Sequence, residues 1–244
     1  MRTLLVALFL LLFFIISIPL YLILLIIGLF NPKQKHKISQ RIVSTVCKII
    51  LFLSGVKLTV MGISNIPEDE SVLFVFNHRS YYDILVSYAS VPKLSAFIAK
   101  KELKRFPFIN VWISFVNSLF IDRDDIRQSL KIILEAVEIV KDGYSIFISP
   151  EGTRNSEKDL LPFKEGSFKI AEKTSCPIIP VSINNADSVF EKHVPWVKKS
   201  HIIIEYGEPI YSKELDRSTH KSLAKYVQNI IADTLEKNDT RLEF

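Results

Sequence analysis

An uncharged apolar segment near the start of the chain sets the strongest limit on how the protein can fold. Leu4 to Phe30 contains no charged side chain and consists mainly of Leu, Ile, Phe and Val. About 20 apolar residues span a bilayer as a helix, so the segment is long enough to be embedded in lipid. Pro19 lies near its middle, where proline removes a backbone donor and bends or breaks a helix. Two arrangements stay open, one kinked crossing or two short helices that enter one leaflet and return, and Pro19 favours a bent or re-entrant segment.

A cleaved signal peptide is a third interpretation of this segment. Such a peptide has an apolar core of about 7–15 residues that ends at a small-residue cleavage site. Here the core is longer and runs from Gly28 into Lys33 without such a site, so we expect it to be retained. Arg2 alone precedes the segment, whereas the basic residues behind it are Lys33, Lys35, Lys37, Arg41 and Lys48. Basic residues that flank a membrane segment are enriched on the cytoplasmic side of the membrane. We therefore expect attachment to the cytoplasmic membrane with the bulk of the chain on its cytoplasmic face.

A helix with one apolar face is expected next. Ile38 to Leu53 places apolar residues at helical spacing, and Gly55 ends the pattern. With lysines before it, this helix suits the surface of a membrane. We therefore divide the chain into an N-terminal membrane anchor, residues 1–55, and a second domain, residues 56–244, which carries the chemistry.

Short strand-like segments alternate with helical ones from Val56 onward. The expected strands are Val56–Val60, Val72–Phe76, Ala96–Ala99, Ser118–Ile121, Ser145–Ile148, Ile178–Ile183 and Ile202–Tyr206. The expected helices are Tyr81–Ser90, Ile109–Val116, Ile126–Val140, Gly166–Lys173 and Thr219–Glu236. Continuous runs of Val, Ile and Phe are typical of strands covered on both faces. The alternation predicts an α/β fold, with a mostly parallel central sheet of about seven strands flanked by helices and preceded by a membrane-embedded helical module.

A histidine and an aspartate follow the second expected strand. Asn77 and His78 come directly after Phe76, and Asp83 stands five residues beyond His78. In open α/β sheets, chemistry takes place at the carboxyl ends of the strands. A carboxylate that accepts from one ring nitrogen orients the imidazole and leaves the other nitrogen to take a proton. The same spacing also fits a structural arrangement in which both residues only organise the start of a helix.

Basic and polar side chains follow three other expected strands. Lys100 and Arg123 each come at a strand end, the block Pro150–Arg154 ends a third strand, and Lys164 lies downstream. Arginine offers a planar fork that suits phosphate, and Gly152 lets the backbone approach a ligand closely. Since parallel strands end at one edge of a sheet, these residues predict a cationic pocket wall near the histidine.

The net charge of +5 is a mild basic surplus, and at least half of the clustered basic residues fit an ordinary solvated surface. Basic residues cluster at 33–48, at Lys100, Lys101, Lys104 and Arg105, and at Lys192, Lys198 and Lys199. Nucleic acid is one candidate for such clusters, but beside a membrane segment anionic lipid headgroups fit better, and no nucleic acid is expected. Cys47 and Cys176 have no metal or disulfide spacing and suit small core positions. We expect neither a metal nor another cofactor.

Four blocks in order resemble those of the glycerolipid acyltransferase family. They are Asn77-His78-x4-Asp83, Phe120-Ile121-Asp122-Arg123, Pro150-Glu151-Gly152-Thr153-Arg154 and Pro177-Ile178-Ile179-Pro180-Val181. No single block is specific, but the ordered combination is. The layout of a membrane module followed by one α/β domain is similar to that of the bacterial 1-acyl-sn-glycerol-3-phosphate acyltransferases.

The resemblance implies roles for individual residues. His78 matches the catalytic base and Asp83 its orienting carboxylate. The residues that match the glycerol phosphate site are Arg123, Glu151, Gly152, Thr153 and Arg154, together with the basic positions Lys100 and Lys164. From the residues alone, Glu151 can equally be a structural carboxylate that supports Arg154.

The implied reaction moves a fatty acyl group from acyl-CoA or acyl-carrier protein to the sn-2 hydroxyl of 1-acyl-sn-glycerol-3-phosphate (lysophosphatidic acid), giving phosphatidic acid. Similar enzymes use other acceptors, such as a lysophospholipid or a lyso-ornithine lipid. An acyl thioester is already reactive, so a positioned alcohol and a base suffice. A thioesterase would not need the basic residues, and a non-catalytic module that binds anionic lipid would not need His78 with Asp83.

Overall fold

Seven strands form one sheet in the computed structural model of the chain, which describes residues 1–155, 157 and 159–242. The strands are β1 (Val56–Met61), β2 (Leu73–Phe76), β3 (Ser95–Lys100), β4 (Leu119–Ile121), β5 (Ser145–Ile148), β6 (Ile178–Asn184) and β7 (Ser200–Tyr206). They lie in the order β1-β7-β6-β2-β5-β3-β4, and the paired neighbours are parallel except β6 with β7. This confirms the predicted α/β class. The expected second domain, 56–244, includes four residues outside the described ones: 156, 158, 243 and 244.

The centre of the sheet is apolar on both faces. All four residues of β2 and all four of β5 are buried, as their unbroken apolar sequences predict. The ring of Phe147 on β5 stacks on Phe74 of β2, with ring centroids 4.2 Å apart, and on Phe97 of β3, at 4.5 Å. These rigid central strands hold the loops at their carboxyl ends in fixed positions.

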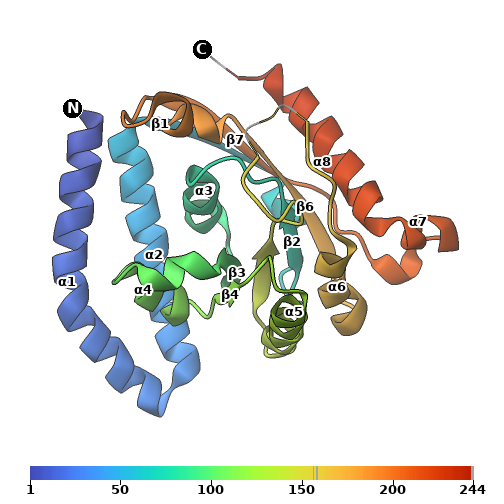
Figure 1. Cartoon of the computed structure of the whole chain (residues 1–244), viewed down its shortest axis with the longest axis horizontal. Coiled ribbons are helices and arrows are strands. Elements are labelled where there is room, and N and C mark those ends of the chain that lie inside the picture. Colours follow the sequence, from blue (N-terminus) through green and yellow to red (C-terminus); the bar gives the residue numbers. More distant parts are fainter. Residues whose placement is uncertain (156, 158, 243–244) are drawn as a thin grey trace.

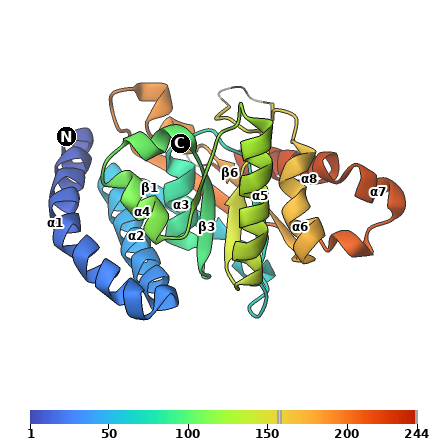
Figure 2. The ribbon, with the colours of Figure 1, turned by 60° about the horizontal axis from the view of Figure 1, so that its bottom comes forward.

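Helices cover both faces of the sheet (Figures 1 and 2). One face packs on α5 (Ile126–Lys141), α6 (Lys169–Thr174) and α8 (Leu223–Asp239), and the other on α2 (Pro32–Ser54) and α3 (Tyr82–Ser90). Helix α4 (Ile109–Phe115) lies beside α2, and α7 (Arg217–Lys221) precedes α8. The helix predicted over Thr219–Glu236 is therefore two helices, which meet at Ser222.

The N-terminal residues form a helical hairpin. Helix α1 (Arg2–Phe30) continues through Pro19 without a break, so the alternative of two separate short helices does not form. Figure 1 shows α1 bending along its length. Asn31 then caps α2 by accepting a hydrogen bond from the backbone N–H of Gln34 (2.9 Å), with Pro32 in the first helical position. This cap explains why α2 begins six residues before the predicted Ile38.

Helix α1 lies along the outside of the protein. Among the described residues it is the one helix long and apolar enough to cross a membrane, and most of its large apolar side chains are exposed. Three hydrogen bonds tie it to the second domain: Val197 N to Thr3 Oγ1 (2.8 Å), Trp112 Nε1 to Ser17 Oγ (2.9 Å) and Tyr21 Oη to the Phe108 carbonyl (2.9 Å). The hairpin is therefore packed side-on against the α/β domain and is not a free tether.

Candidate active site

The histidine at the end of β2 is held by a buried carboxylate. His78 Nδ1 lies 2.8 Å from Asp83 Oδ2, and the side chain of Asp83 is fully buried. The same oxygen accepts hydrogen bonds from the backbone N–H groups of Arg79 and Ser80, both at 2.7 Å. A proton on Nδ1 satisfies the carboxylate and leaves Nε2 as the basic nitrogen. The geometry is that of a base and its orienting group.

The end of β2 is itself pinned to the neighbouring strand. The side chain of Asn77 donates to the Ile183 carbonyl (2.9 Å) and accepts from the Ile183 N–H (2.8 Å). Just beyond β2, these two side-chain hydrogen bonds take the place of the backbone hydrogen bonds between strands. Asn77 is fully buried, so both of its polar groups are satisfied inside the protein. The position of the next residue, His78, is therefore set by the sheet.

Glu151 supports the histidine loop from behind. Its Oε1 accepts from the backbone N–H of His78 (3.0 Å), and its Oε2 accepts from Asn155 Nδ2 (3.1 Å) and from the Leu161 N–H (3.0 Å). The carboxylate is buried. Within the described part of the chain, Arg154 is not among its hydrogen-bond partners. This geometry favours a structural role in which the carboxylate joins two loops.

Two arginines lie at the same edge of the sheet. Arg123 donates through Nη1 to the carbonyl of Gly152, and burial lowers the pKa of its guanidinium. Arg154 lies over the ring of Tyr81, 3.9 Å from its centroid, and its Nη1 is 3.5 Å from Glu191 Oε1. Since arginine stays protonated even with a lowered pKa, both carry positive charge toward the cavity that they line.

Gly152 allows a close packing contact beside these arginines. Its φ is +75°, and a Cβ there would lie 2.8 Å from Lys164 Nζ. Lys164 thus packs against the Gly152 backbone, and it is not among the residues that line the cavity. Lys100 does line the cavity, with its Nζ 3.4 Å from Glu102, and Thr153 lies at its wall with Arg154.

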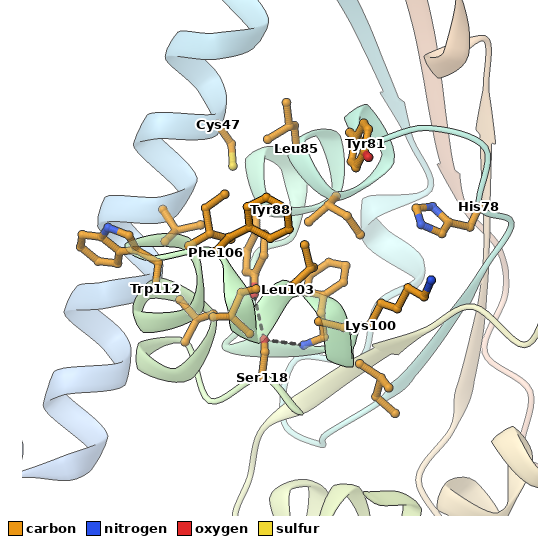
Figure 3. A pocket seen from close by; sticks show the side chains of 18 of the residues that line it. Cys47, His78, Tyr81, Leu85, Tyr88, Lys100, Leu103, Phe106, Trp112 and Ser118 are labelled. Atoms are coloured by element: carbon orange, nitrogen blue, oxygen red, sulfur yellow. Dashed lines mark hydrogen bonds between the residues drawn. The ribbon is translucent and has the colours of Figure 1, made fainter. Parts of the chain in front are cut away.

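A cavity of about 650 Å³ extends from His78 into the apolar interior (Figure 3). Figure 3 shows His78 and Lys100 at one end, with Trp112 and Cys47 at the other. Helix α1 contributes Phe13 and Phe14 to its wall. The cavity therefore joins a polar, cationic end to a long apolar end.

The apolar end contains one small polar group. Ser118 Oγ accepts from the Phe97 N–H (2.8 Å) and lies 3.3 Å from Tyr88 Oη. Burial raises the pKa of Tyr88, so the phenol stays neutral. The wall of this end thus carries no charge at Ser118 or Tyr88.

Of the nine predicted site residues, five line the cavity: His78, Lys100, Arg123, Thr153 and Arg154. Asp83 and Glu151 are buried behind His78, while Gly152 and Lys164 pack against each other. Residues that the sequence did not single out are Tyr81, Glu191 and the aromatic wall from α1 and α4. Tyr81 stands inside the histidine block, but no spacing connects Glu191 to it. Among the described residues, no group of three His, Cys, Asp or Glu side chains is arranged to hold a metal ion.

Comparison with known proteins identifies the family. The family model for acyltransferases matches residues 57–184, which is more than half of the chain. The chain belongs to the acyltransferase family. A 1-acyl-sn-glycerol-3-phosphate acyltransferase of Borreliella burgdorferi is 32% identical over 189 residues, covering 78% of this chain and 76% of that protein. The enzyme of the same name from Saccharomyces cerevisiae is 27% identical, covering 80% and 67%.

A solved acyltransferase structure has the same fold over its whole length. The crystal structure of the 1-acyl-sn-glycerophosphate (LPA) acyltransferase PlsC from Thermotoga maritima superimposes with a TM-score of 0.79 at 28% identity, covering 100% of both chains. The match includes the N-terminal hairpin as well as the α/β domain. The chain is thus an acyltransferase enzyme.

Proposed function

We propose that this acyltransferase moves a fatty acyl group from an acyl thioester to the sn-2 hydroxyl of 1-acyl-sn-glycerol-3-phosphate, giving phosphatidic acid. The observation that carries the proposal is the cavity, which has an imidazole base and two arginines at one end and a long apolar wall at the other. The relatives named for the same acceptor support this choice. Neither a carrier protein nor coenzyme A is favoured as donor by the described residues.

His78 acts as the general base in this proposal. Its Nε2 takes the proton of the acceptor hydroxyl as the oxygen attacks the thioester carbonyl, and the tetrahedral intermediate then expels the thiolate. The imidazolium returns the proton to the sulfur, so the products are an ester and a thiol. Asp83, 2.8 Å from Nδ1, stabilises the positive charge that His78 carries in between.

The basic residues bind the acceptor phosphate. Arg154 and Arg123 present planar guanidinium groups at the cavity end beside His78, and Lys100 adds a third positive charge. Lys164 contributes through its contact with Gly152, which places the backbone close to Arg123. Positive charge around the reacting carbonyl also stabilises the oxyanion.

The hairpin seats the enzyme in the cytoplasmic leaflet. Helix α1 contacts the α/β domain through Thr3 near its start and through Tyr21 in its second half. Beyond its far end, α2 contacts the same domain, because Gln40 bonds the Lys93 carbonyl and the Ser95 N–H. A helix that crossed the bilayer would have one end on the opposite side, so these contacts favour a hairpin of the continuous helix α1 and helix α2 that enters and leaves through one leaflet. The lysines at the start of α2 suit the cytoplasmic surface.

The test is a direct assay of the purified full-length enzyme in vesicles that contain lysophosphatidic acid. With acyl-CoA or acyl-carrier protein supplied separately, we expect phosphatidic acid from at least one donor. His78→Ala should lower kcat by about 10²–10⁴-fold. Release of free fatty acid without phosphatidic acid would instead establish a thioesterase. Transfer only to another lysolipid would change the acceptor but keep the reaction class.

The arginine assignment has its own measurement. Arg154→Ala and Arg123→Ala should raise the apparent KM for lysophosphatidic acid more than that for the acyl donor, because the proposal assigns both arginines to the phosphate of the acceptor and not to the phosphates of the donor. Arg217→Ala, an exposed arginine on α7, is the matched control and should change neither KM. Equal effects of Arg154→Ala on both substrates would place the phosphate elsewhere.

A further inference from the structure

The connection between β6 and β7 is far longer than a hairpin needs. These two strands are antiparallel neighbours, yet residues 185–199 separate them. Most hairpins close with loops of about 2–5 residues, and much longer loops in compact domains usually have a function. We refer to residues 185–199 as the β6–β7 loop.

The tip of the β6–β7 loop exposes large apolar side chains among basic ones. Val194 is 64% exposed and Trp196 is 61% exposed, and exposed apolar side chains that lie together mark a surface for a partner or a membrane. Lys192, Lys198 and Lys199 surround them and are exposed. An indole with lysines beside it is the composition found at the headgroup level of membranes.

The tip lies next to the membrane helix. The backbone N–H of Val197 donates to Thr3 Oγ1 at the start of α1, at 2.8 Å. Figure 1 shows this loop beside the N-terminal end of α1, where Arg2 marks the end of the apolar segment. The loop therefore lies beside the end of α1, where its apolar segment meets charged groups.

A residue near the middle of the loop contacts the active site. Glu191 accepts hydrogen bonds from Ser80 Oγ (2.6 Å) and the Tyr81 N–H (2.8 Å), and it pairs with Arg154 at 3.5 Å. The same loop thus touches the histidine block, Arg154 and helix α1. The contacts of Glu191 with the active site and of Val197 with α1 lie on either side of the tip and fix its position.

We propose that the β6–β7 loop is a second membrane-binding element, which inserts Val194 and Trp196 at the headgroup level of an anionic bilayer and pairs Lys198 and Lys199 with lipid phosphates. The partner is a lipid surface because the exposed apolar tip lies beside the end of the apolar helix α1 and its flanks are positive. The proposal rests on the membrane seating described above. It adds a contact between the bilayer and the residues that hold Arg154.

The experiment uses the fluorescence of Trp196 in the full-length enzyme. The chain has two tryptophans, and Trp112 is buried, so the difference between the wild type and Trp196→Phe reports Trp196 alone. The enzyme is reconstituted in phosphatidylcholine vesicles with or without phosphatidylglycerol, and quenching by lipids brominated near the headgroup is compared with quenching by aqueous acrylamide. We expect Trp196 to be quenched by the brominated lipid and protected from acrylamide, most strongly with phosphatidylglycerol.

Charge reversal tests whether the effect of phosphatidylglycerol depends on the lysines of the loop or only on the net charge of the protein. Lys198→Glu with Lys199→Glu should remove the added quenching that phosphatidylglycerol produces. The control pair, Lys221→Glu with Lys225→Glu on α7 and α8, makes the same change in net charge on exposed lysines away from α1 and should leave the quenching unchanged. Equal loss in both variants would overturn the proposal.

Two other results would also overturn it. Acrylamide access to Trp196 that is the same in all vesicles would mean that the tip faces water. Protection that grows with the protein-to-lipid ratio would mean that a second copy of the chain covers the tip. Transfer to lysophosphatidic acid is assayed in parallel, so a failure of the loop proposal with activity retained is distinct from a failure of the proposed function.

Discussion

Replacing Asp83 with asparagine isolates the charge behind His78. Asparagine keeps the size of the side chain, and its amide oxygen can still accept from the Arg79 and Ser80 N–H groups, which lie 2.7 Å from Asp83 Oδ2. What it removes is the negative charge 2.8 Å from His78 Nδ1. Because the imidazolium forms only during the reaction, the loss should appear in kcat and leave both KM values nearly unchanged.

The size of the effect follows from the geometry. The contact places the centres of the two charges about 4 Å apart, where an effective dielectric constant of about 20 gives an attraction of about 4 kcal/mol. At about 1.4 kcal/mol for each factor of ten, kcat should fall about 10³-fold.

The assay is the rate of phosphatidic acid formation in vesicles at saturating substrate. Asp216→Asn is the matched control, since Asp216 also accepts from backbone N–H groups at a helix start but caps α7, away from the cavity. Its kcat should match the wild type. The melting temperature of each variant shows whether the fold is retained. A kcat for folded Asp83→Asn within about tenfold of the wild type would refute the reasoning, because the carboxylate would then carry almost none of the charge stabilisation.

Three further outcomes are expected. Tyr21→Phe removes the hydrogen bond to the Phe108 carbonyl, worth about 1 kcal/mol, and should lower the melting temperature of the detergent-solubilised enzyme by about 2–4 °C; an unchanged value would show that α1 is not docked there. Burial raises the pKa of the Cys47 thiol to about 12, so iodoacetamide at neutral pH should label it only after unfolding, and rapid labelling of the native enzyme would contradict this. His36 pairs with Tyr144 (2.9 Å), and burial lowers its pKa below the ordinary 6.5. The unfolded chain therefore binds this proton first, and stability should fall as the pH drops below 6.5 and through the folded pKa, by less in His36→Gln, as measured by urea unfolding.

The strands and the histidine pair were predictable because their signals are local. The buried strands β2 and β5 are continuous apolar runs, and the structure places them within one residue of the prediction. His78 and Asp83 are five residues apart, so a single turn brings them together. Lys100, Arg123 and Arg154 come from different strand ends, and their meeting follows from the parallel sheet.

Contacts that depend on distant segments were not predictable. Glu191 reaches Ser80 across 111 residues of chain, and its loop carries no motif. Glu151 was expected either to support Arg154 or to act directly, but its oxygens lie on the His78 and Leu161 N–H groups. The sequence shows that a glutamate stands at this position, but it does not show which backbone N–H groups the carboxylate accepts from.

Helix α1 forms part of the wall of the cavity beside His78. Phe13 and Phe14 of α1 line the cavity that begins at His78, and Trp112 on the opposite wall bonds Ser17 of α1. Ser17 and Tyr21 are the polar side chains within the apolar segment. Both form hydrogen bonds with residues in or directly before α4. A helix that only held the enzyme at the membrane would need neither residue. In the proposed function the hairpin therefore has two roles, because its exposed outer side faces lipid while its inner side completes the wall of the cavity.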